Sequence, residues 1–476
     1  MTLALVVDVG SSSSKVALYE TAYGLVAESL HTRSHSMTRE PSGVAIFDAV
    51  HLREEIEALI DHALTHPRAG EISAVAFCSF VGNLVGLDQD FQPITPLWTY
   101  ADTRAVEFVR DFASLDASIH QRSGCHVHTA YAPSWFGWMQ NHTPHVLTAV
   151  AHWMDFITYC YSTWAQRPIP IGASLASWTG LVNMKNIDWD SIWFDALALS
   201  AHHFPPVTVA PICPVPITRW DQLKDAVWLL GIADGYAAHL GSVGADANGV
   251  SLTVGTTCAL RQLTATLPDP LGVPLWGYAV GEKQWLLGGA TSEGGNLYQW
   301  ARQTLALPSL EACEKWLGER PIGAHGLTVL PHLGGERSPN WNPHAIGNIH
   351  GIRFETTPLD ILQALYESLA MQLRLIFEEM PHAPAQVALG GGAVERSPYL
   401  AQLIANALAI PTNLMIGQDV TLRGLAWHVA TTLQQPTPPV ALHTLPPQPL
   451  AVEQLAQLRD KQVAWYRHIH STDHSQ

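Results

Sequence analysis

The sequence predicts an α/β protein built from two related domains. The chain has 476 residues, more than a single hydrophobic core usually holds. Apolar strand-like segments alternate with helical patterns along its length. A unit made of an apolar strand followed by glycine and hydroxyl residues occurs at the start of the chain and again about halfway. We place the boundary at residue 245, so the predicted domains are 1–245 and 246–476.

The individual elements follow from local patterns. A β-branched run, residues 3–9, predicts the first strand, and residues 16–19 resume a strand after a polar turn. Residues 52–64 have the periodicity of a helix, and residues 72–77 form an apolar run typical of a buried strand. By the same criteria we expect later strands at 227–232, 250–254 and 387–389, and helices at 399–408 and 452–468.

Composition and charge exclude several classes of protein. Hydrophobic residues make up 47% of the chain and the net charge is −16 without any block of like charge, which argues against nucleic acid as a partner. No apolar run is long enough to span a membrane, and the N-terminus lacks the basic region of a signal peptide. Six dispersed cysteines without a CxxC pair indicate reduced thiols, so we expect a cytoplasmic enzyme.

The first polar turn is a candidate phosphate-binding element. Residues 8–15 read Asp-Val-Gly-Ser-Ser-Ser-Ser-Lys, in which glycine and serine allow backbone N–H groups and hydroxyls to approach phosphate oxygens. The carboxylate of Asp8 is suited to hold hydrated Mg²⁺. The alternative is an ordinary polar hairpin turn. The candidate phosphate-binding residues are Gly10, Ser11, Ser12, Ser13 and Lys15.

Two further glycine turns follow predicted buried strands. The turn Gly255-Thr256-Thr257 repeats the design of the first, and two such turns in one α/β chain strengthen the phosphate interpretation. A triple glycine at residues 390–392 lets a ligand or another backbone come close, although a tight turn before a helix would use the same residues. The candidate nucleotide-binding residues there are Gly391, Gly392 and Ala393.

Two segments carry candidate catalytic and acceptor-binding groups. Asp234 lies at the end of a buried strand between glycines, where a carboxylate can act as the general base that deprotonates a hydroxyl. Its alternative role is to cap a helix. Trp98, Asp102 and Arg104 offer an apolar face, hydrogen-bond acceptors and a guanidinium to a polyol. The alternative for these three is a loop with an internal Asp–Arg pair.

Taken together, these motifs resemble the FGGY family of carbohydrate kinases over nearly the whole chain. Ala101-Asp102-Thr103-Arg104-Ala105 is similar to the version found in gluconate kinases. Six segments occur in the order that the family has them. They are residues 8–15, Trp98 to Arg104, Gly231 to Thr257, Gly294-Gly295-Asn296 with Trp300, Gly335 to Trp341 with Gly347, and Gly390 to Gly392 with Gln402.

The resemblance implies a fold and a chemistry. The fold would consist of two actin-like, ribonuclease H-like domains with an interdomain cleft, the sugar lying with the first domain and ATP mainly with the second. Asp234 would activate the attacking hydroxyl, and Mg²⁺ would be held through water by Asp8 and Asp234. Partners would be a small sugar or sugar-acid substrate, with a homodimer as one option for assembly.

Several positions depart from the family pattern. Phe80-Val81-Gly82 stands where xylulose kinases have a Gln-Met-His stretch, and gluconate kinases also commonly keep the histidine. Tyr131 to Gln140 lacks the usual lysine, Asn406 replaces an aspartate, and Ile346 stands where arginine is frequent. The phosphoryl-transfer motifs are kept, whereas the acceptor pocket is altered.

For the acceptor we favour gluconate or a similar aldonate, because the Ala-Asp-Thr-Arg loop and the turn running from Gly255 to Arg261 are of gluconate-kinase type. A ketose or polyol such as xylulose is the second candidate. A degenerate kinase that only senses sugar or nucleotide is a third. An ATPase of the chaperone type shares the broad fold, but Trp98, Asp102 and Arg104 argue against it.

Overall fold

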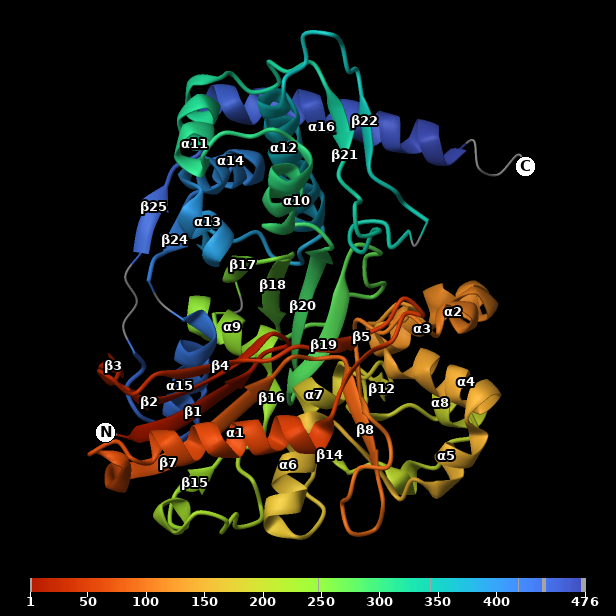
Figure 1. Cartoon of the computed structure of the whole chain (residues 1–476), viewed down its shortest axis with the longest axis vertical. Coiled ribbons are helices and arrows are strands. Elements are labelled where there is room, and N and C mark those ends of the chain that lie inside the picture. Colours follow the sequence, from red (N-terminus) through yellow and green to blue (C-terminus); the bar gives the residue numbers. More distant parts are fainter. Residues whose placement is uncertain (1, 247, 343, 418, 439–441, 472–476) are drawn as a thin grey trace.

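The computed structural model describes residues 2–246, 248–342, 344–417, 419–438 and 442–471. Two mixed seven-stranded sheets form its centre, one in each half of the chain, and helices pack around both (Figure 1). This arrangement confirms the predicted α/β class with two related halves. Of the helices in the described residues, none is long and apolar enough to cross a bilayer.

The first sheet has the order β15-β7-β1-β2-β3, with β16 added beside β7 and β4 beside β2. Strand β1 runs antiparallel to β2 and parallel to β7, so the hairpin and a crossover strand share one central strand. The strands are β1 (Leu3–Val9), β2 (Ser13–Glu20), β3 (Gly24–Leu25), β4 (His31–Ser34), β7 (Ile72–Ser79), β15 (Val227–Trp228) and β16 (Ile232–Ala233).

The second sheet repeats the centre of the first. Strand β17 runs antiparallel to β18 and parallel to β23, as β1 does with β2 and β7. The order is β19-β20-β18-β17-β23-β24-β25. The strands are β17 (Val250–Val254), β18 (Cys258–Thr264), β19 (Trp276–Gly281), β20 (Gln284–Thr291), β23 (Val387–Gly390), β24 (Thr412–Met415) and β25 (Leu442–Leu445).

Each half carries additional elements. In the first half, β8 (Asn83–Leu87), β9 (Leu97–Thr99) and β6 (Ala45–Phe47) belong to a smaller sheet, next to α4 (Ala132–His142). Helix α1 (Ala49–Ala63) begins at Asp48, whose carboxylate caps it by accepting from Val50 and His51 N–H. The second half contains α10 (Asn296–Thr304), α11 (Leu310–Glu319), α12 (Pro358–Glu378), α13 (Gly392–Arg396), α14 (Pro398–Leu408) and α16 (Pro449–Ser471).

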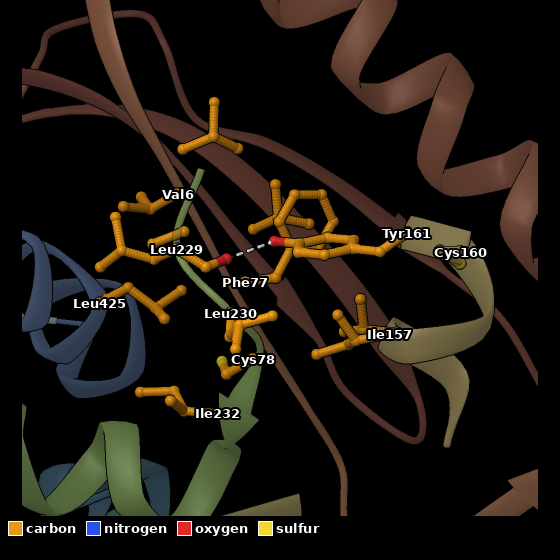
Figure 2. Packing of buried hydrophobic residues seen from close by; sticks show 14 of the residues in the cluster. Val6, Phe77, Cys78, Ile157, Cys160, Tyr161, Leu229, Leu230, Ile232 and Leu425 are labelled. Carbon is orange, nitrogen blue, oxygen red and sulfur yellow. Dashed lines mark hydrogen bonds between the residues drawn. The ribbon is translucent and has the colours of Figure 1, made fainter. Parts of the chain in front are cut away.

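Helix α15 (Val420–Thr432) belongs to the second half in sequence but packs on the first sheet, where it contacts β1 and β7 (Figure 1). Leu425 of α15 lies in the same buried cluster as Val6 and Phe77 (Figure 2). In that cluster, Tyr161 donates its hydroxyl proton to the Leu229 carbonyl at 3.0 Å. The core of the first half is therefore completed by residues from the second half.

Helices α9 (Asp234–Val243) and α15 cross at two glycines. A Cβ atom at Gly241 would overlap the Val420 carbonyl oxygen, and one at Gly424 would overlap the Ala237 carbonyl oxygen. The absence of side chains at both positions lets the two backbones touch. Because α9 starts at Asp234, this close crossing also helps to hold the Asp234 carboxylate in position.

Candidate active site

The first glycine turn folds as the sequence predicts. Strand β1 ends at Val9, and the Gly10 N–H donates to the Ser13 carbonyl at 3.0 Å, which closes a tight turn into β2. A Cβ at Gly10 would lie 2.7 Å from that carbonyl oxygen, so the turn requires glycine. The side chain of Ser12 is exposed at the tip, whereas Ser14 is buried. The exposed side chain of Ser12 is therefore placed where it can meet an anion.

The second turn is also closed by a bond from its glycine N–H, but it is one residue shorter. The Gly255 N–H donates to the Thr257 carbonyl at 3.0 Å, between β17 and β18. Thr256 and Thr257 are both exposed. The Gly255 carbonyl accepts from the N–H of Gly295 at 2.8 Å, which brings the start of α10 against this turn. The two related halves therefore each offer one glycine and hydroxyl turn.

The triple glycine meets the second turn. Gly391 has a φ of +111°, a conformation that favours glycine, and its missing Cβ would overlap the Val254 carbonyl at the end of β17. Gly392 begins helix α13. The Ala393 Cβ lies 3.1 Å from the Cβ position of Gly295. The structure thus joins the predicted residues Gly255, Gly391, Gly392 and Ala393 in one region of the second half.

Asp8 and Asp234 lie at the same edge of the first sheet. Strands β1 and β16 both run parallel to β7 and flank it, and these two residues stand at their carboxyl ends. Ligands of open α/β sheets bind outside the carboxyl ends of strands. Asp234 is the first residue of α9, whose N-cap is Ala233, and its Oδ1 accepts from the Gly235 N–H at 2.7 Å.

Both carboxyl groups hold protons more tightly than ordinary aspartates. Burial, together with the nearby charge of Asp419, raises the pKa of Asp8 to about 7, although Lys15 opposes the rise. The Cys78 thiol also donates to Asp8 Oδ1 at 3.4 Å. Burial raises the pKa of Asp234 to about 6, against the opposing charge of Arg261. A carboxylate with a pKa near neutrality is well matched to general-base chemistry.

Lys15, a predicted phosphate ligand, makes an ion pair across the two halves. It stands opposite Asp8 in the β1–β2 hairpin. Its Nζ lies 2.6 Å from Oδ2 of Asp419, the residue that caps α15. The pair places a cation next to the Asp8 carboxylate and the glycine turn.

The predicted acceptor residues Trp98, Asp102 and Arg104 form an internal cluster. The Arg104 guanidinium donates from Nε and Nη2 to the Asp102 carboxylate at 3.0 and 2.8 Å. It also lies over the Trp98 ring, 4.0 Å from its centroid. Trp98 is 3% exposed and Asp102 is fully buried. The pairing of Asp102 with Arg104 is the alternative that the sequence left open, and an acceptor-binding role for these three residues stays a prediction.

Tyr100 is the residue of this loop that reaches the first phosphate turn, and sequence reasoning did not single it out. Its ring is 39% exposed and its hydroxyl lies 3.2 Å from Ser11 Oγ. A Cβ at Gly82, which has a φ of +64°, would lie 2.9 Å from the Tyr100 Cβ. The altered segment at residues 80–82 therefore packs against the tyrosine. The available signal was its place beside Asp102 in an otherwise recognised loop.

Arg261 was also missed as a site residue. It lies on β18, its Nη1 donates to Thr253 Oγ1 at 3.2 Å, and its Nε is 3.0 Å from the Cβ position of Gly235. A guanidinium from the second half thus stands beside the residue that follows Asp234. In the sequence, Arg261 stood out only as the last residue of a turn of gluconate-kinase type.

The described side chains include no group of three or more His, Cys, Asp or Glu placed to hold a metal ion. All six cysteines are buried and unbridged. Two glycine and hydroxyl turns, a lysine and a strand-end aspartate with a raised pKa define the class: a two-domain phosphotransferase that acts on an alcohol group.

Comparison with known proteins identifies the family. Residues 3–212 match the N-terminal domain, and residues 250–432 the C-terminal domain, of the FGGY family of carbohydrate kinases. The chain belongs to this family and is a carbohydrate kinase. The matched ranges lie on either side of the predicted boundary at residue 245, which stays a prediction because β19, β20 and α15 contribute to the core of the first half.

Curated relatives and solved structures agree with this family. The gluconokinase of Bacillus subtilis (strain 168) is 24% identical over 427 residues, covering 84% of this chain and 82% of the relative. The xylulose kinase of Streptomyces rubiginosus is 27% identical over 468 residues, covering 89% and 90%. Among solved structures, a ligand-bound xylulose kinase from Lactobacillus acidophilus has a TM-score of 0.89 at 22% identity, with 99% of each chain covered. A gluconate kinase from the same organism has a TM-score of 0.88 at 23% identity, with 98% of each covered.

Proposed function

We propose that this kinase transfers the γ-phosphoryl group of ATP to a hydroxyl group of gluconate or a similar aldonate. The observation that carries the proposal is Asp234, a strand-end carboxylate whose pKa is about 6, at the sheet edge that also holds Asp8 and the first glycine turn. The acceptor oxygen attacks the γ-phosphorus, the bond to the β,γ-bridging oxygen breaks, and ADP leaves. The hydroxyl proton passes to Asp234.

The two glycine turns would position the phosphates. Backbone N–H groups and hydroxyls of Ser11, Ser12 and Ser13 on one side, and of Thr256 and Thr257 on the other, stabilise the charge that spreads over the transferring group. Gly391 and Gly392 allow the nucleotide to lie close to the backbone near the start of α13. Lys15 adds a positive charge to the first turn.

The residues present fit hydrated Mg²⁺ bound together with the nucleotide. Mg²⁺ usually keeps several waters and takes only one or two carboxylates plus phosphate oxygens, so a full protein cage is not needed. Asp8 and Asp234 would hold it through water. Both lie at the same sheet edge, and burial is the main cause of their raised pKa values, to which Asp419 adds at Asp8. The ion would supply neutralisation of the phosphate charge.

An aldonate acceptor is supported by the relatives named gluconokinase and by the loop that carries Trp98, Asp102 and Arg104. We propose that these three residues hold their loop in the shape that binds the acceptor. Tyr100, on the same loop, would then make the contact with the acceptor. Xylulose is the second candidate, favoured by the similarity to xylulose kinases. Since the six thiols are buried and unpaired, we place the enzyme in the cytoplasm.

The test is ADP release by purified protein with MgATP across aldonates, ketoses, polyols and a blank without acceptor. We expect gluconate or a close aldonate to give the highest kcat/KM. A ketose in first place would replace the aldonate assignment. ADP release at the level of the blank for every acceptor, with intact ATP binding, would favour a protein that senses nucleotide or sugar.

A further inference from the structure

The second half contains a cavity that the kinase chemistry does not use. Its walls come from helix α12, helix α16 and the segment from His332 to Asn340, and its volume is about 310 Å³. Ligand pockets in proteins start at about 300 Å³, so this cavity can hold a small molecule. None of the residues assigned above to phosphate, nucleotide or acceptor binding lines it.

A buried carboxylate lines this cavity without a cationic partner. Glu336 is 5% exposed, and its oxygens accept from Asn340 Nδ2 and from the Tyr466 hydroxyl, both at 2.6 Å. In the described part of the chain, the one basic side chain within 4 Å of it is His332, at 3.9 Å. Burial lowers the pKa of His332 to about 4, so this imidazole is neutral at pH 7. A carboxylate buried among neutral groups is stabilised most by a ligand that brings a positive charge.

A second acceptor on the cavity wall also lacks a donor. Gln372 of α12 is 4% exposed, and its Nε2 lies 3.4 Å from His332 Nδ1. Its Oε1 has no hydrogen-bond partner among the described groups. An unpaired amide oxygen in the interior is unfavourable unless a ligand or water donates to it. The polar side of the cavity is therefore rich in acceptors, whereas Leu330, Leu375 and Val463 make other parts of the wall apolar.

The charge around the cavity favours a cation. Glu378 and Glu379 line it together with Glu336, and they face a single guanidinium, that of Arg467. Glu378 is already paired with two arginines of its own. Glu379 is exposed and has no lysine or arginine within ion-pair distance in the described chain. This balance disfavours phosphates, nucleotides and sugar acids, so the substrates of the kinase reaction are poor occupants.

We propose that this cavity binds a small aliphatic amine. Its ammonium group donates to the carboxylate of Glu336 and to the amide oxygen of Gln372, and its methylene groups lie against Leu330, Leu375 and Val463. In a diamine, the second ammonium group meets Glu379, the exposed carboxylate of the wall. The site is independent of the sugar acceptor, because it shares no residue with the glycine turns or with Asp234.

Calorimetric titration of the full-length enzyme at pH 7.5 compares butylamine and butane-1,4-diamine with butane-1,4-diol, a neutral counterpart. We expect saturable binding of both amines and at least about tenfold weaker binding of the diol, which lacks the charge. Glu336→Gln should weaken both amines at least about tenfold and change the diol less than about threefold. Glu355→Gln is the matched control, since it alters an exposed glutamate away from this cavity, and it should change none of the three.

Two exposed wall positions keep the site testable if Glu336→Gln does not fold. Arg467→Gln should strengthen amine binding severalfold, because it removes the guanidinium that repels the ligand, and Glu379→Gln should weaken the diamine more than butylamine. Equal affinity for diol and diamine would assign the cavity to polyols and overturn the proposal. No saturable binding of either amine below about 10 mM, or weaker amine binding by Arg467→Gln, would also overturn it. Each of these results leaves the kinase function standing, because ADP release is measured without amine.

Discussion

Lys15 Nζ and Asp419 Oδ2 lie 2.6 Å apart and join residues that are separated by 404 positions in the chain. The lysine follows the first glycine turn, and the aspartate caps the helix that the second half contributes to the first sheet. Asp419 also belongs to the charges that raise the pKa of Asp8. The pair therefore links three features of the molecule. These are the first glycine turn, the candidate magnesium-binding residue Asp8 and the contact between the two halves.

Lys15→Met should lower kcat/KM for MgATP by at least about 10-fold, because a charged hydrogen bond to phosphate is lost. Steady-state kinetics with varied MgATP provide the measurement. Lys185→Met is the matched control, since Lys185 forms a surface pair with Asp269 at 3.1 Å, with both side chains more than half exposed. Equal effects of the two substitutions would refute a phosphate role for Lys15.

Asp234→Asn should lower turnover by roughly 10³-fold, because the amide keeps the shape of the side chain but cannot accept the hydroxyl proton. Nucleotide affinity, measured by calorimetry, should change only severalfold. Turnover within about tenfold of the unmodified enzyme would show that another group acts as the base.

The pH dependence of kcat/KM for the acceptor should show an acid limb. The base must be ionised, and the pKa of Asp234 is about 6, so activity should fall about tenfold per unit once the pH drops below that value. The test is a profile of kcat/KM against pH from 5 to 8, together with a check at each pH that the enzyme remains folded. A flat profile down to pH 5 would contradict the assigned pKa or the assigned base.

Asp8→Asn should stabilise the nucleotide-free, metal-free protein clearly more at pH 8 than at pH 5. The folded pKa of about 7 exceeds the ordinary 3.8, so the folded state binds the extra proton and stability falls as pH rises from about 4 through 7. Replacing the carboxyl group by an amide removes that loss, which we put at roughly 2–4 kcal/mol. Thermal unfolding in EDTA at the two pH values gives the comparison. If the variant were less stable than the parent at pH 8, the Asp8 carboxylate would stabilise the folded protein, and the raised pKa assigned to it would be wrong.

Gly424→Ala and Gly318→Ala should act in opposite directions, although both glycines are helical. At Gly424 the added Cβ would overlap the Ala237 carbonyl, so the crossing of α9 and α15 must open. At Gly318 of α11 nothing lies within 4 Å, and alanine should stabilise that helix by up to about 1 kcal/mol. Unfolding midpoints of both variants measure the contrast. A neutral Gly424→Ala would show that the helices can separate at little cost.

Much of the fold could be read from local patterns. The runs at residues 3–9 and 250–254 coincide with β1 and β17, and the helix expected at 399–408 is α14. The strand expected at 227–232 is split into β15 and β16. Leu229 still donates its N–H to Val75 of β7, but its carbonyl accepts from Tyr161 and the Leu230 N–H donates to the Pro211 carbonyl, so the ladder with β7 is interrupted there. Glycine turns were predicted well because their backbone geometry depends on few residues.

The acceptor side was harder to predict, because its residues are brought together by tertiary contacts. Trp98 has the residue type expected of a sugar contact, yet burial places it against Arg104, while Tyr100 reaches Ser11. Arg261 meets Gly235 only when the second sheet packs beside α9. The sequence alone does not show that Gly235 packs against Arg261. It also does not show which side chains of the loop from Trp98 to Arg104 are exposed.

The position of α15 has a consequence for how the protein is made. Residues emerging first from the ribosome include β1 and β7, but Leu422, Leu425 and Val429, which cover them, are synthesised more than 340 residues later than Phe77. Until then the nascent first half exposes apolar surface that would attract chaperones or other chains. A fragment that stops near residue 245 should consequently be prone to aggregate, and co-expression of the remaining segment should restore its solubility.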